Sequence, residues 1–332
     1  MKKSTTNSSA RRKLIPAVAM LTTSAIMLST ATYAWFTMNK TVEVTGLSMT
    51  ATTADALEIS LGGYGADNAI TFTAQPADTV TEKSWTNAIT IGEYYSKIGK
   101  IIPSSTTNCA KMFYTTDATN GGQIATKFGE VTAAANKALV ARTTYDAAGA
   151  LATPTDADDT GYYVDIPVFL RTSKVADATT TDADIYCIMN ITGDTDEELY
   201  KAARVAFIND ANGNGVVDTD ETSAAIWGAD ATYYHSGDTT PLQGIASIDG
   251  EGIGTRGAVT VVTDTNVNNG KATGLSIPLA ATTGSYGHAN FVMRVWLEGE
   301  STFCKDANAA QDWNIDMKFA IDNADTSFVA FT

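Results

Sequence analysis

Short runs in which apolar and polar residues alternate recur along most of this chain, and they constrain its fold more than any other feature. Alternation places the apolar side chains on one face of an extended strand. The runs are rich in Val, Ile, Thr and aromatic residues, and they cover 57–61, 163–170, 184–192, 258–262, 275–279, 288–298 and 313–321. Only 195–202 and 304–312 suggest a helical turn or two. We therefore predict an all-β fold, a jelly roll or related β-sandwich with long loop insertions and only short helices.

The domain organisation follows from the spacing of these runs. A chain of 332 residues is long enough for one large core or two ordinary ones. Two stretches, near 115–160 and 209–257, are rich in small and acidic residues and have weak periodicity, so we predict that they are insertions. We expect one elaborated β domain over 51–332, with a second β lobe built from the insertions as the alternative.

The first 34 residues have the layout of a secretory signal. Residues 1–13 are polar and basic, 14–30 are mainly apolar, and Ala31-Thr-Tyr-Ala34 places small residues at the −3 and −1 positions of a cut. We predict a processing site between Ala34 and Trp35. An uncleaved membrane anchor is the alternative, because the apolar stretch is about 20 residues long and such a stretch can span a bilayer. We expect the body of the protein to be extracellular, and any membrane contact to be made by the uncleaved signal alone.

Charge and motif content limit the possible functions. The net charge is −15 and all five basic residues of the first 34 positions would leave with the signal, so the mature chain repels nucleic acid and anionic lipid. No zinc, P-loop, nucleophile-elbow or dinucleotide-binding motif is present, and the two histidines, His235 and His288, suggest no catalytic pair. We expect that the protein is not an enzyme, with a hydrolase that uses a carboxylate pair as the remote alternative.

One segment, 210–221, matches the twelve-residue calcium loop. Gly215 occupies position 6, where the chain must turn sharply, and Glu221 occupies position 12, which supplies a bidentate carboxylate. The flanking residues 203–208 predict a strand, so the loop would stabilise a β insertion and would not act as a helix-pair sensor. An Asn- and Gly-rich surface turn is the alternative. The predicted Ca²⁺ ligands are Asp210, Asn212, Asn214, Val216, Asp218 and Glu221.

The chain contains three cysteines. Cys187 lies in an apolar strand-like run, so we expect a buried thiol. Cys109 and Cys304 flank loop-like segments and form a possible disulfide, but sequence alone leaves their pairing open.

The segment after the predicted cut is amphipathic. Phe36, Met38, Val42 and Val44 share one face of an extended strand, whereas beyond Gly46 the apolar positions change parity. A strand can change parity only at a bulge or bend, which Gly46 permits. We predict a donor-type strand over 35–50 that pairs either within its own domain or with the sheet edge of a neighbour. Its candidate contact residues are Trp35, Phe36, Met38, Val42 and Val44.

The run Thr32-Tyr-Ala-Trp-Phe-Thr-Met-Asn39, followed by an early strand that ends near Leu61, resembles the TasA/camelysin family of exported proteins of Gram-positive bacteria. The resemblance implies a dedicated signal peptidase, a jelly-roll fold and a biofilm-matrix fibre in which 35–44 inserts into the next subunit. It covers the chain up to Leu61 and does not extend to the calcium loop. Camelysin is described as a metalloprotease, but no zinc-binding signature is present here, so that activity is not implied.

These features together predict a secreted structural subunit that assembles head to tail with copies of itself into a cell-surface or biofilm fibre, stabilised by calcium. A matrix polysaccharide is a further candidate partner. The second hypothesis is a calcium-dependent carbohydrate-binding or adhesion β-sandwich.

Overall fold

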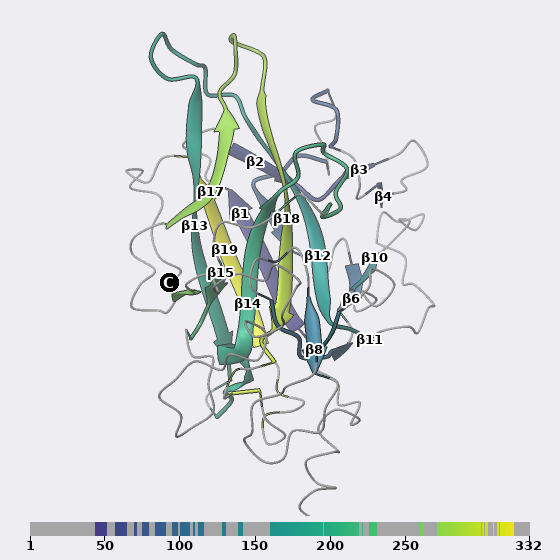
Figure 1. The fold of residues 1–332 in the computed structure, drawn as a ribbon. Helices are drawn as coiled ribbons and strands as arrows, with labels where there is room; N and C mark the ends of the chain where they lie inside the picture. Colours follow the sequence, from purple (N-terminus) through teal and green to yellow (C-terminus); the bar gives the residue numbers. More distant parts are fainter. Residues whose placement is uncertain are drawn as a thin grey trace, which may run out of the picture.

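The protein, seen here in a computed structural model, is built from two facing β-sheets (Figure 1). The structure describes residues 44–51, 57–64, 70–71, 75–79, 84–90, 95–98, 100–106, 109, 112–115, 128–130, 139–141, 160–194, 196–218, 221, 226–230, 259–261, 271–299, 301, 303–304, 308, 311 and 313–321.

The first sheet has five strands in the order β17-β13-β19-β1-β5. Its central strands are β13, which is antiparallel to β19 over Tyr186–Gly193, and β1, which is parallel to β19. The short strand β5 is antiparallel to β1 at the sheet's end. The bounds are β1 Val44–Ala51, β5 Ala88–Thr90, β13 Asp182–Gly193, β17 Lys271–Pro278 and β19 Trp313–Ala320.

The second sheet has six strands in the order β16-β15-β14-β18-β12-β2. Its centre is the antiparallel set β14, β18 and β12, and β2 pairs with the end of β12 at the sheet's edge. The bounds are β2 Leu57–Ser60, β12 Tyr163–Thr172, β14 Ala203–Asn209, β15 Ile226–Gly228, β16 Val259–Val261 and β18 Gly287–Leu297.

The remaining described elements are short. Four two-stranded pairs accompany the sheets: β3 Gly63–Tyr64 with β4 Ile70–Thr71, β6 Tyr95–Ile98 with β10 Leu139–Ala141, β7 Lys100–Ile101 with β11 Thr160–Gly161, and β8 Phe113–Thr115 with β9 Phe128–Glu130. A single 3-10 turn, η3 Leu199–Ala202, precedes β14 in the described part of the chain.

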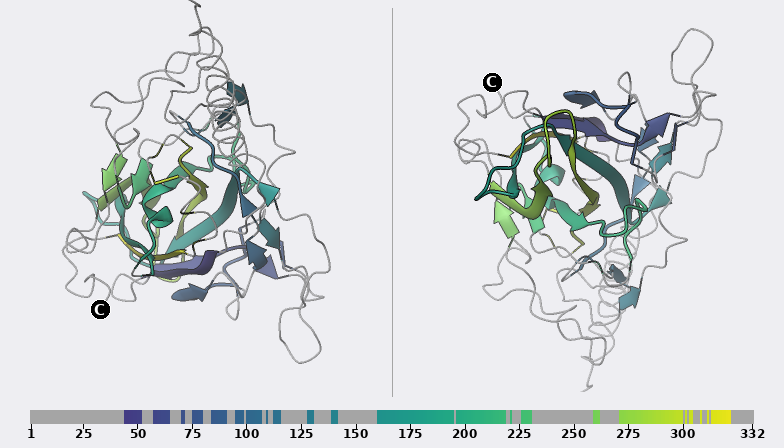
Figure 2. Two further views of the ribbon diagram at one scale, coloured as in Figure 1. Left: turned by 90° about the horizontal axis from the view of Figure 1, so that it is seen from below. Right: turned by 90° about the horizontal axis from the view of Figure 1, so that it is seen from above.

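The core lies between the two sheets, which face each other when the molecule is viewed along the strands (Figure 2). In β19 every odd-numbered residue from Trp313 to Phe319 is buried, and the residues between them are partly exposed. Phe207 of β14 meets Phe291 of β18 edge-on at 5.7 Å between ring centroids, and it meets Phe319 of the opposite sheet at 5.9 Å. The alternation seen in the sequence therefore corresponds to the inward faces of the two sheets.

The outer face of the six-stranded sheet is also covered. Cys109 and Met112 pack against Tyr163, Ile208 and Trp296, which point away from the main core. The sheet is therefore buried on both faces where residues between β5 and β9 cross it.

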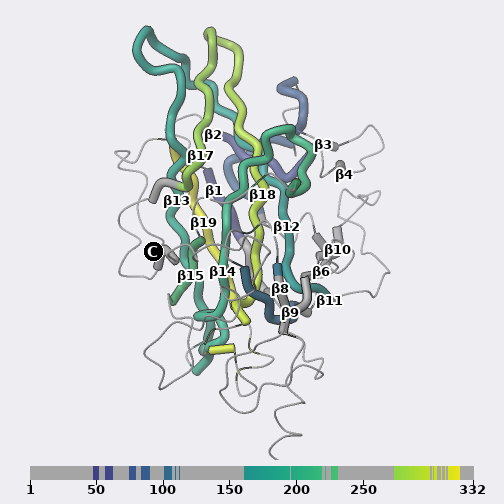
Figure 3. The backbone as a smooth tube through the Cα atoms, in the orientation of Figure 1, coloured from purple at the N-terminus to yellow at the C-terminus, as the bar shows by residue number. Residues whose placement is uncertain are grey.

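The connections β12–β13 and β17–β18 extend beyond the sheets at one end (Figure 3). They are joined to each other by hydrogen bonds from Ala176 N to Ala280 O and from Ala280 N to Lys174 O, at 2.9 and 2.8 Å.

The all-β sandwich and each of the seven alternating runs predicted as strands are confirmed. Jelly-roll connectivity stays a prediction, because the strand orders establish two sheets and the pairs β1–β19 and β15–β16 are parallel. Most of the insertion 115–160, and residues 231–257 of the second insertion, lie outside the described residues.

Candidate functional site

The predicted calcium loop follows β14 directly and is attached to the neighbouring strand. Asp210 N donates to Asn290 O of β18 at 3.1 Å. The carboxylates at the two ends of the loop are buried, Asp210 at 3% and Glu221 at 7% exposure. The strand predicted ahead of the loop is β14, so the segment lies in a β context, as expected.

The oxygens of the predicted ligand residues already organise the loop backbone. The Asp210 carboxylate accepts from the backbone N–H groups of Asn214 and Gly215, at 3.0 and 2.7 Å. Glu221 accepts from Ala211 N at 2.9 Å and from Asp218 N at 3.0 Å, which closes the loop end to end. Because each carboxylate is held by two backbone donors, both point inward.

Glycine is required at two turns of the loop. Gly213 and Gly215 have φ angles of 69° and 72°. These angles lie in the left-handed region, which is unfavourable for residues that carry a Cβ atom. The glycine expected at position 6 of a calcium loop therefore has the conformation that this position requires.

The two asparagines connect the middle of the loop. Asn212 Oδ1 accepts from Asn214 N at 2.9 Å, and Asn214 Oδ1 accepts from Val216 N at 2.8 Å. Their side-chain nitrogens both donate to Asp218 Oδ2, at 2.6 and 3.1 Å. An amide oxygen has two lone pairs, so each can accept one N–H and still face a cation.

The donor set fits Ca²⁺, which prefers hard oxygen ligands. Among the described residues, no three His, Cys, Asp or Glu side chains are grouped so that they could hold a metal ion. A Ca²⁺ ion would therefore need the amide oxygens of Asn212 and Asn214 and the carbonyl of Val216 as well as the loop carboxylates. Calcium binding stays a prediction.

The N-terminal strand enters the interior of the five-stranded sheet. Val44 is in register with Trp313 and Gly46 with Asn314, so one extra residue, Thr45, lies between them. This register shift is the bulge that the change of parity at Gly46 predicted. The other residues predicted for processing and for the donor strand, Ala34, Trp35, Phe36, Met38 and Val42, lie outside the described residues.

The three cysteines are free and buried. The alternative of a Cys109–Cys304 disulfide is therefore not realised, and the expectation of a buried thiol at Cys187 is confirmed. Burial raises the pKa of Cys109 to about 12 although the nearby Arg294 opposes the shift, and burial also raises the pKa values of Cys187 and Cys304. Neutral thiols of this kind are poor nucleophiles.

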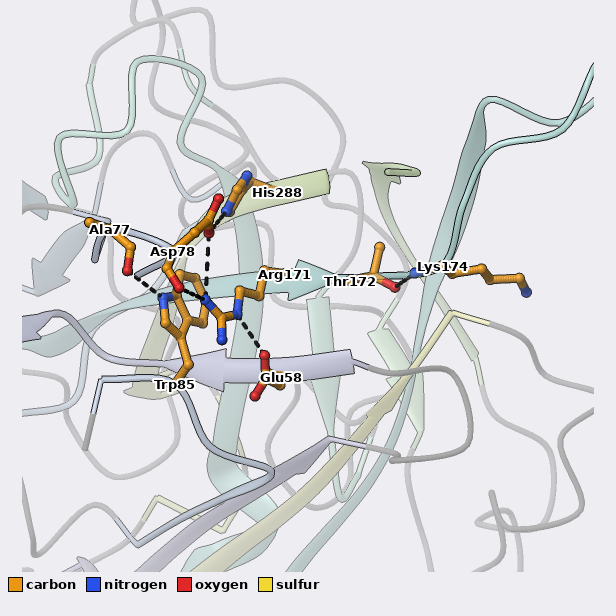
Figure 4. Close-up of polar contacts among 8 residues, drawn as sticks. All are labelled: Glu58, Ala77, Asp78, Trp85, Arg171, Thr172, Lys174 and His288. Atoms are coloured by element: carbon orange, nitrogen blue, oxygen red, sulfur yellow. Dashed lines mark hydrogen bonds and ion pairs between the residues drawn. The ribbon is translucent and has the colours of Figure 1, made fainter. Parts of the chain in front are cut away.

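A charged cluster that no sequence pattern predicted lies on the outer face of the six-stranded sheet. Arg171 of β12 is only 2% exposed, and its register partners are Glu58 of β2 and His288 of β18. Arg171 Nε donates to Glu58 Oε2 at 2.6 Å, and Nη1 donates to the backbone oxygen of Asp78 at 3.0 Å (Figure 4).

Aromatic rings and a histidine complete this Arg171 cluster. The guanidinium carbon lies 4.6 Å from the Trp85 ring centroid and 4.1 Å from that of Tyr286. His288 Nε2 is 2.8 Å from Asp78 Oδ1, and Trp85 Nε1 donates to Ala77 O at 3.3 Å. His288 therefore links β18 to Asp78 within this cluster. His235 lies outside the described residues.

A second cluster lies further along the same face. Arg294 of β18 forms two hydrogen bonds of 2.7 Å to the Asp165 carboxylate, donates to Cys109 O, and lies 4.2 Å from the Tyr163 ring centroid. In this Arg294 cluster, as in the Arg171 cluster, an arginine joins a carboxylate on the adjacent strand to a backbone carbonyl of the segment that covers the sheet.

Comparisons with protein-family models, with curated proteins and with solved structures find no match for this chain. The relationship to the TasA/camelysin family therefore stays a prediction. None of the helices in the described part is long and apolar enough to cross a membrane.

Proposed function

We propose that this protein is a secreted structural subunit of a Gram-positive bacterium that assembles head to tail into an extracellular, biofilm-type fibre by donor-strand exchange. The observation that carries the proposal is the position of β1. The strand lies between β19 and β5, inside the sheet, and the amphipathic residues 35–44 lead into it across the bulge at Gly46.

The sequence of 35–44 supplies a reason for assembly. Its apolar side chains occupy alternate positions, so an extended strand would present one apolar face. Burial of such side chains stabilises a structure by about 1.5–3 kcal/mol each. Addition to the sheet edge of a neighbour buries this face and pairs the backbone of both strands. Because the donor lies at one end of the chain and its acceptor is elsewhere, the contact is heterologous and propagates in one direction.

Calcium would act on the stability of the subunit. The loop 210–221 joins the end of β14 to Asn290 of β18, so an ion held there would fix two central strands of the six-stranded sheet. Two Asn ligands in place of carboxylates favour a modest affinity, on the order of 10⁻⁴–10⁻³ M, as in extracellular modules.

The test is to express residues 35–332 with a removable N-terminal tag, release the tag in the presence of calcium, and image the product by negative-stain electron microscopy. Filaments are expected only after release. The informative pair of variants is Phe36→Lys, on the apolar face of the segment, and Thr37→Lys, on its other face. Phe36→Lys should abolish filaments and Thr37→Lys should keep them. Persistent monomers of the released wild-type chain would refute the proposal, and a glycan array with and without chelator would then test the carbohydrate-binding alternative.

A further inference from the structure

The loop 210–221 begins beside a side chain of the neighbouring strand. The register of β14 and β18 places Asn209 opposite Phe291. The hydrogen bond from Asp210 N to Asn290 O, at 3.1 Å, continues this pairing by one residue. Residues directly opposite each other on antiparallel strands have their side chains on the same face of the sheet. Asn290 is therefore the cross-strand neighbour of Asp210, the first of the predicted Ca²⁺ ligands.

The side-chain amide of Asn290 also lies next to the turn at Gly213. A Cβ atom added to Gly213 would be 3.0 Å from Asn290 Nδ2. A side chain at this position would therefore press on the amide, in addition to the strain that a φ angle of 69° imposes. Asn290 thus borders the loop at two points, with its backbone at Asp210 and its side chain at Gly213.

The oxygen of the same amide is a buried acceptor without a donor. Asn290 Oδ1 is shielded from solvent, and no hydrogen bond reaches it in the part of the chain that the structure describes. Backbone N–H groups of the loop donate instead to the carboxylates of Asp210 and Glu221. A buried polar atom without a partner destabilises the folded state, and native proteins usually satisfy such an atom with a protein group, an ordered water or an ion.

We propose that Asn290 is a positioning residue of the calcium site, and that its Oδ1 accepts a hydrogen bond from a water molecule bound to the Ca²⁺ ion. The inference rests on the calcium binding in the proposed function, and it adds to that site a residue from outside the twelve-residue loop. Calcium takes six to eight oxygen ligands, and water is commonly among them. The hydrogens of such a water point away from the ion, so the water needs an acceptor nearby.

This arrangement attaches the ion to the six-stranded sheet. β18 is a central strand of that sheet, paired with β14 on one side and β12 on the other. Without calcium, Asn290 Oδ1 stays unpaired and lowers the stability of the folded protein. With calcium, the same atom contributes to binding. Replacement by an apolar side chain should therefore change the stability of the ion-free protein and its calcium affinity in opposite directions.

The experiment measures both quantities in one titration. Thermal unfolding of residues 35–332, with the N-terminal tag retained to prevent assembly, is followed in EDTA and at a series of Ca²⁺ concentrations at constant ionic strength. The rise of the midpoint with calcium gives the dissociation constant. Asn290→Leu replaces the amide by an apolar group of similar size. Asn190→Leu, at a partly exposed asparagine of β13 in the other sheet, is the matched control.

We expect Asn290→Leu to weaken calcium binding about tenfold or more, as the loss of an outer partner of a metal site commonly does. Its midpoint in EDTA should equal or exceed that of the wild type, and Asn190→Leu should keep the wild-type affinity. Wild-type affinity in Asn290→Leu would overturn the inference and leave calcium binding intact. Failure of the wild type to respond to millimolar calcium would instead reject the calcium site itself, so the two failures are distinguishable.

A second variant separates the two ends of the amide. Asn290→Asp keeps an oxygen acceptor, removes Nδ2 and adds a negative charge beside Asp210. It should bind calcium at least as tightly as the wild type, and its midpoint in EDTA should be lower, because like charges opposite each other on neighbouring strands are unfavourable. Equal weakening of calcium binding by Asn290→Asp and Asn290→Leu would show that Nδ2 is the important atom, and would overturn the role of Oδ1.

Discussion

Arg171 and Arg294 each hold a covering segment against the six-stranded sheet, the first near Asp78 and the second near Cys109, but they do so in different environments. Each guanidinium pairs with a carboxylate on the next strand, donates to a backbone carbonyl of the cover and lies against aromatic rings. The carboxylate of the Arg294 cluster is 16% exposed, whereas those of the Arg171 cluster are 33% and 41% exposed. The carboxylates that pair with Arg171 are therefore more open to water than the one that pairs with Arg294, although both arginines are buried.

The difference has a physical cause. Asp165 binds Arg294 through both oxygens in a planar fork, which adds geometric specificity and energy. Arg171 divides its donors between Glu58 and Asp78, and its hold depends more on ring stacking, which tolerates displacement better than a bidentate pair.

The largest change in the free energy of unfolding is expected at the Arg294 cluster. Asp165→Ala leaves the 5%-exposed Arg294 without its counter-charge and should lower the free energy of unfolding by about 3–5 kcal/mol. Urea denaturation followed by tryptophan fluorescence measures it. A loss no larger than that of an exposed control, Asp182→Ala, would remove the difference between the two clusters.

Calcium should raise the free energy of unfolding without changing the difference between the Arg171 and Arg294 clusters. With a dissociation constant on the order of 10⁻⁴ M, 1 mM Ca²⁺ should add about 1–2 kcal/mol to the free energy of unfolding of the wild type. The hydrogen bonds of the described loop residues run within the loop and to Asn290 rather than to either arginine cluster, so the differences caused by Asp165→Ala and by Glu58→Ala should stay the same with calcium. Glu221→Gln should abolish the gain, and calorimetry that detects no calcium binding at millimolar ion would reject the site.

Substitution in the Arg171 cluster should change the free energy of unfolding only weakly. Glu58→Ala removes one hydrogen-bonded partner of Arg171 but leaves Asp78 and both rings, so we expect a loss of about 1 kcal/mol. Limited proteolysis should show faster cleavage within residues 84–90 of this variant than of the wild type. A loss as large as that of Asp165→Ala would remove the difference between the two clusters.

The smallest effect is a change of thiol accessibility. All three cysteines should resist iodoacetamide at pH 8 in the folded protein and react fully in denaturant, which peptide mass spectrometry can quantify. Asp165→Ala should expose Cys109, whose carbonyl Arg294 holds, and Glu58→Ala should not.

The same thiols imply a pH dependence of stability. The pKa values of the thiols are raised in the folded state, so their contribution to stability is complete below the unfolded thiol pKa of about 8.5. That contribution is lost progressively as the pH rises above it, because the unfolded chain then releases protons that the folded chain retains.

What the sequence could predict was local. Alternation located β12, β13, β18 and β19 because each of these strands has one face toward the core. The bulge at Gly46 followed from a change of parity within a few residues, and the turn at Gly215 followed from its place at position 6 of the calcium-loop pattern.

What the sequence could not predict depends on register between distant segments. Arg171 and Glu58 are 113 positions apart, and Arg294 and Asp165 are 129 apart, so no local pattern brings them together. The segment 84–90, which joins the two sheet edges, was missed for the same reason: its few residues carry no alternation, and only the positions of both edges show that it connects them.

The most direct test of the central claim is whether the N-terminal segment contacts its own subunit or the next one. Equal amounts of ¹⁴N- and ¹⁵N-labelled chains are assembled together, treated with a lysine cross-linker, and analysed for peptides joined through Lys40, which lies within the donor segment. We predict that peptides cross-linked through Lys40 contain mixed-isotope pairs as often as like pairs, because the segment would contact the next subunit. Links from Lys40 that join only chains of the same isotope would show that the segment closes its own sheet, and would contradict donor-strand exchange.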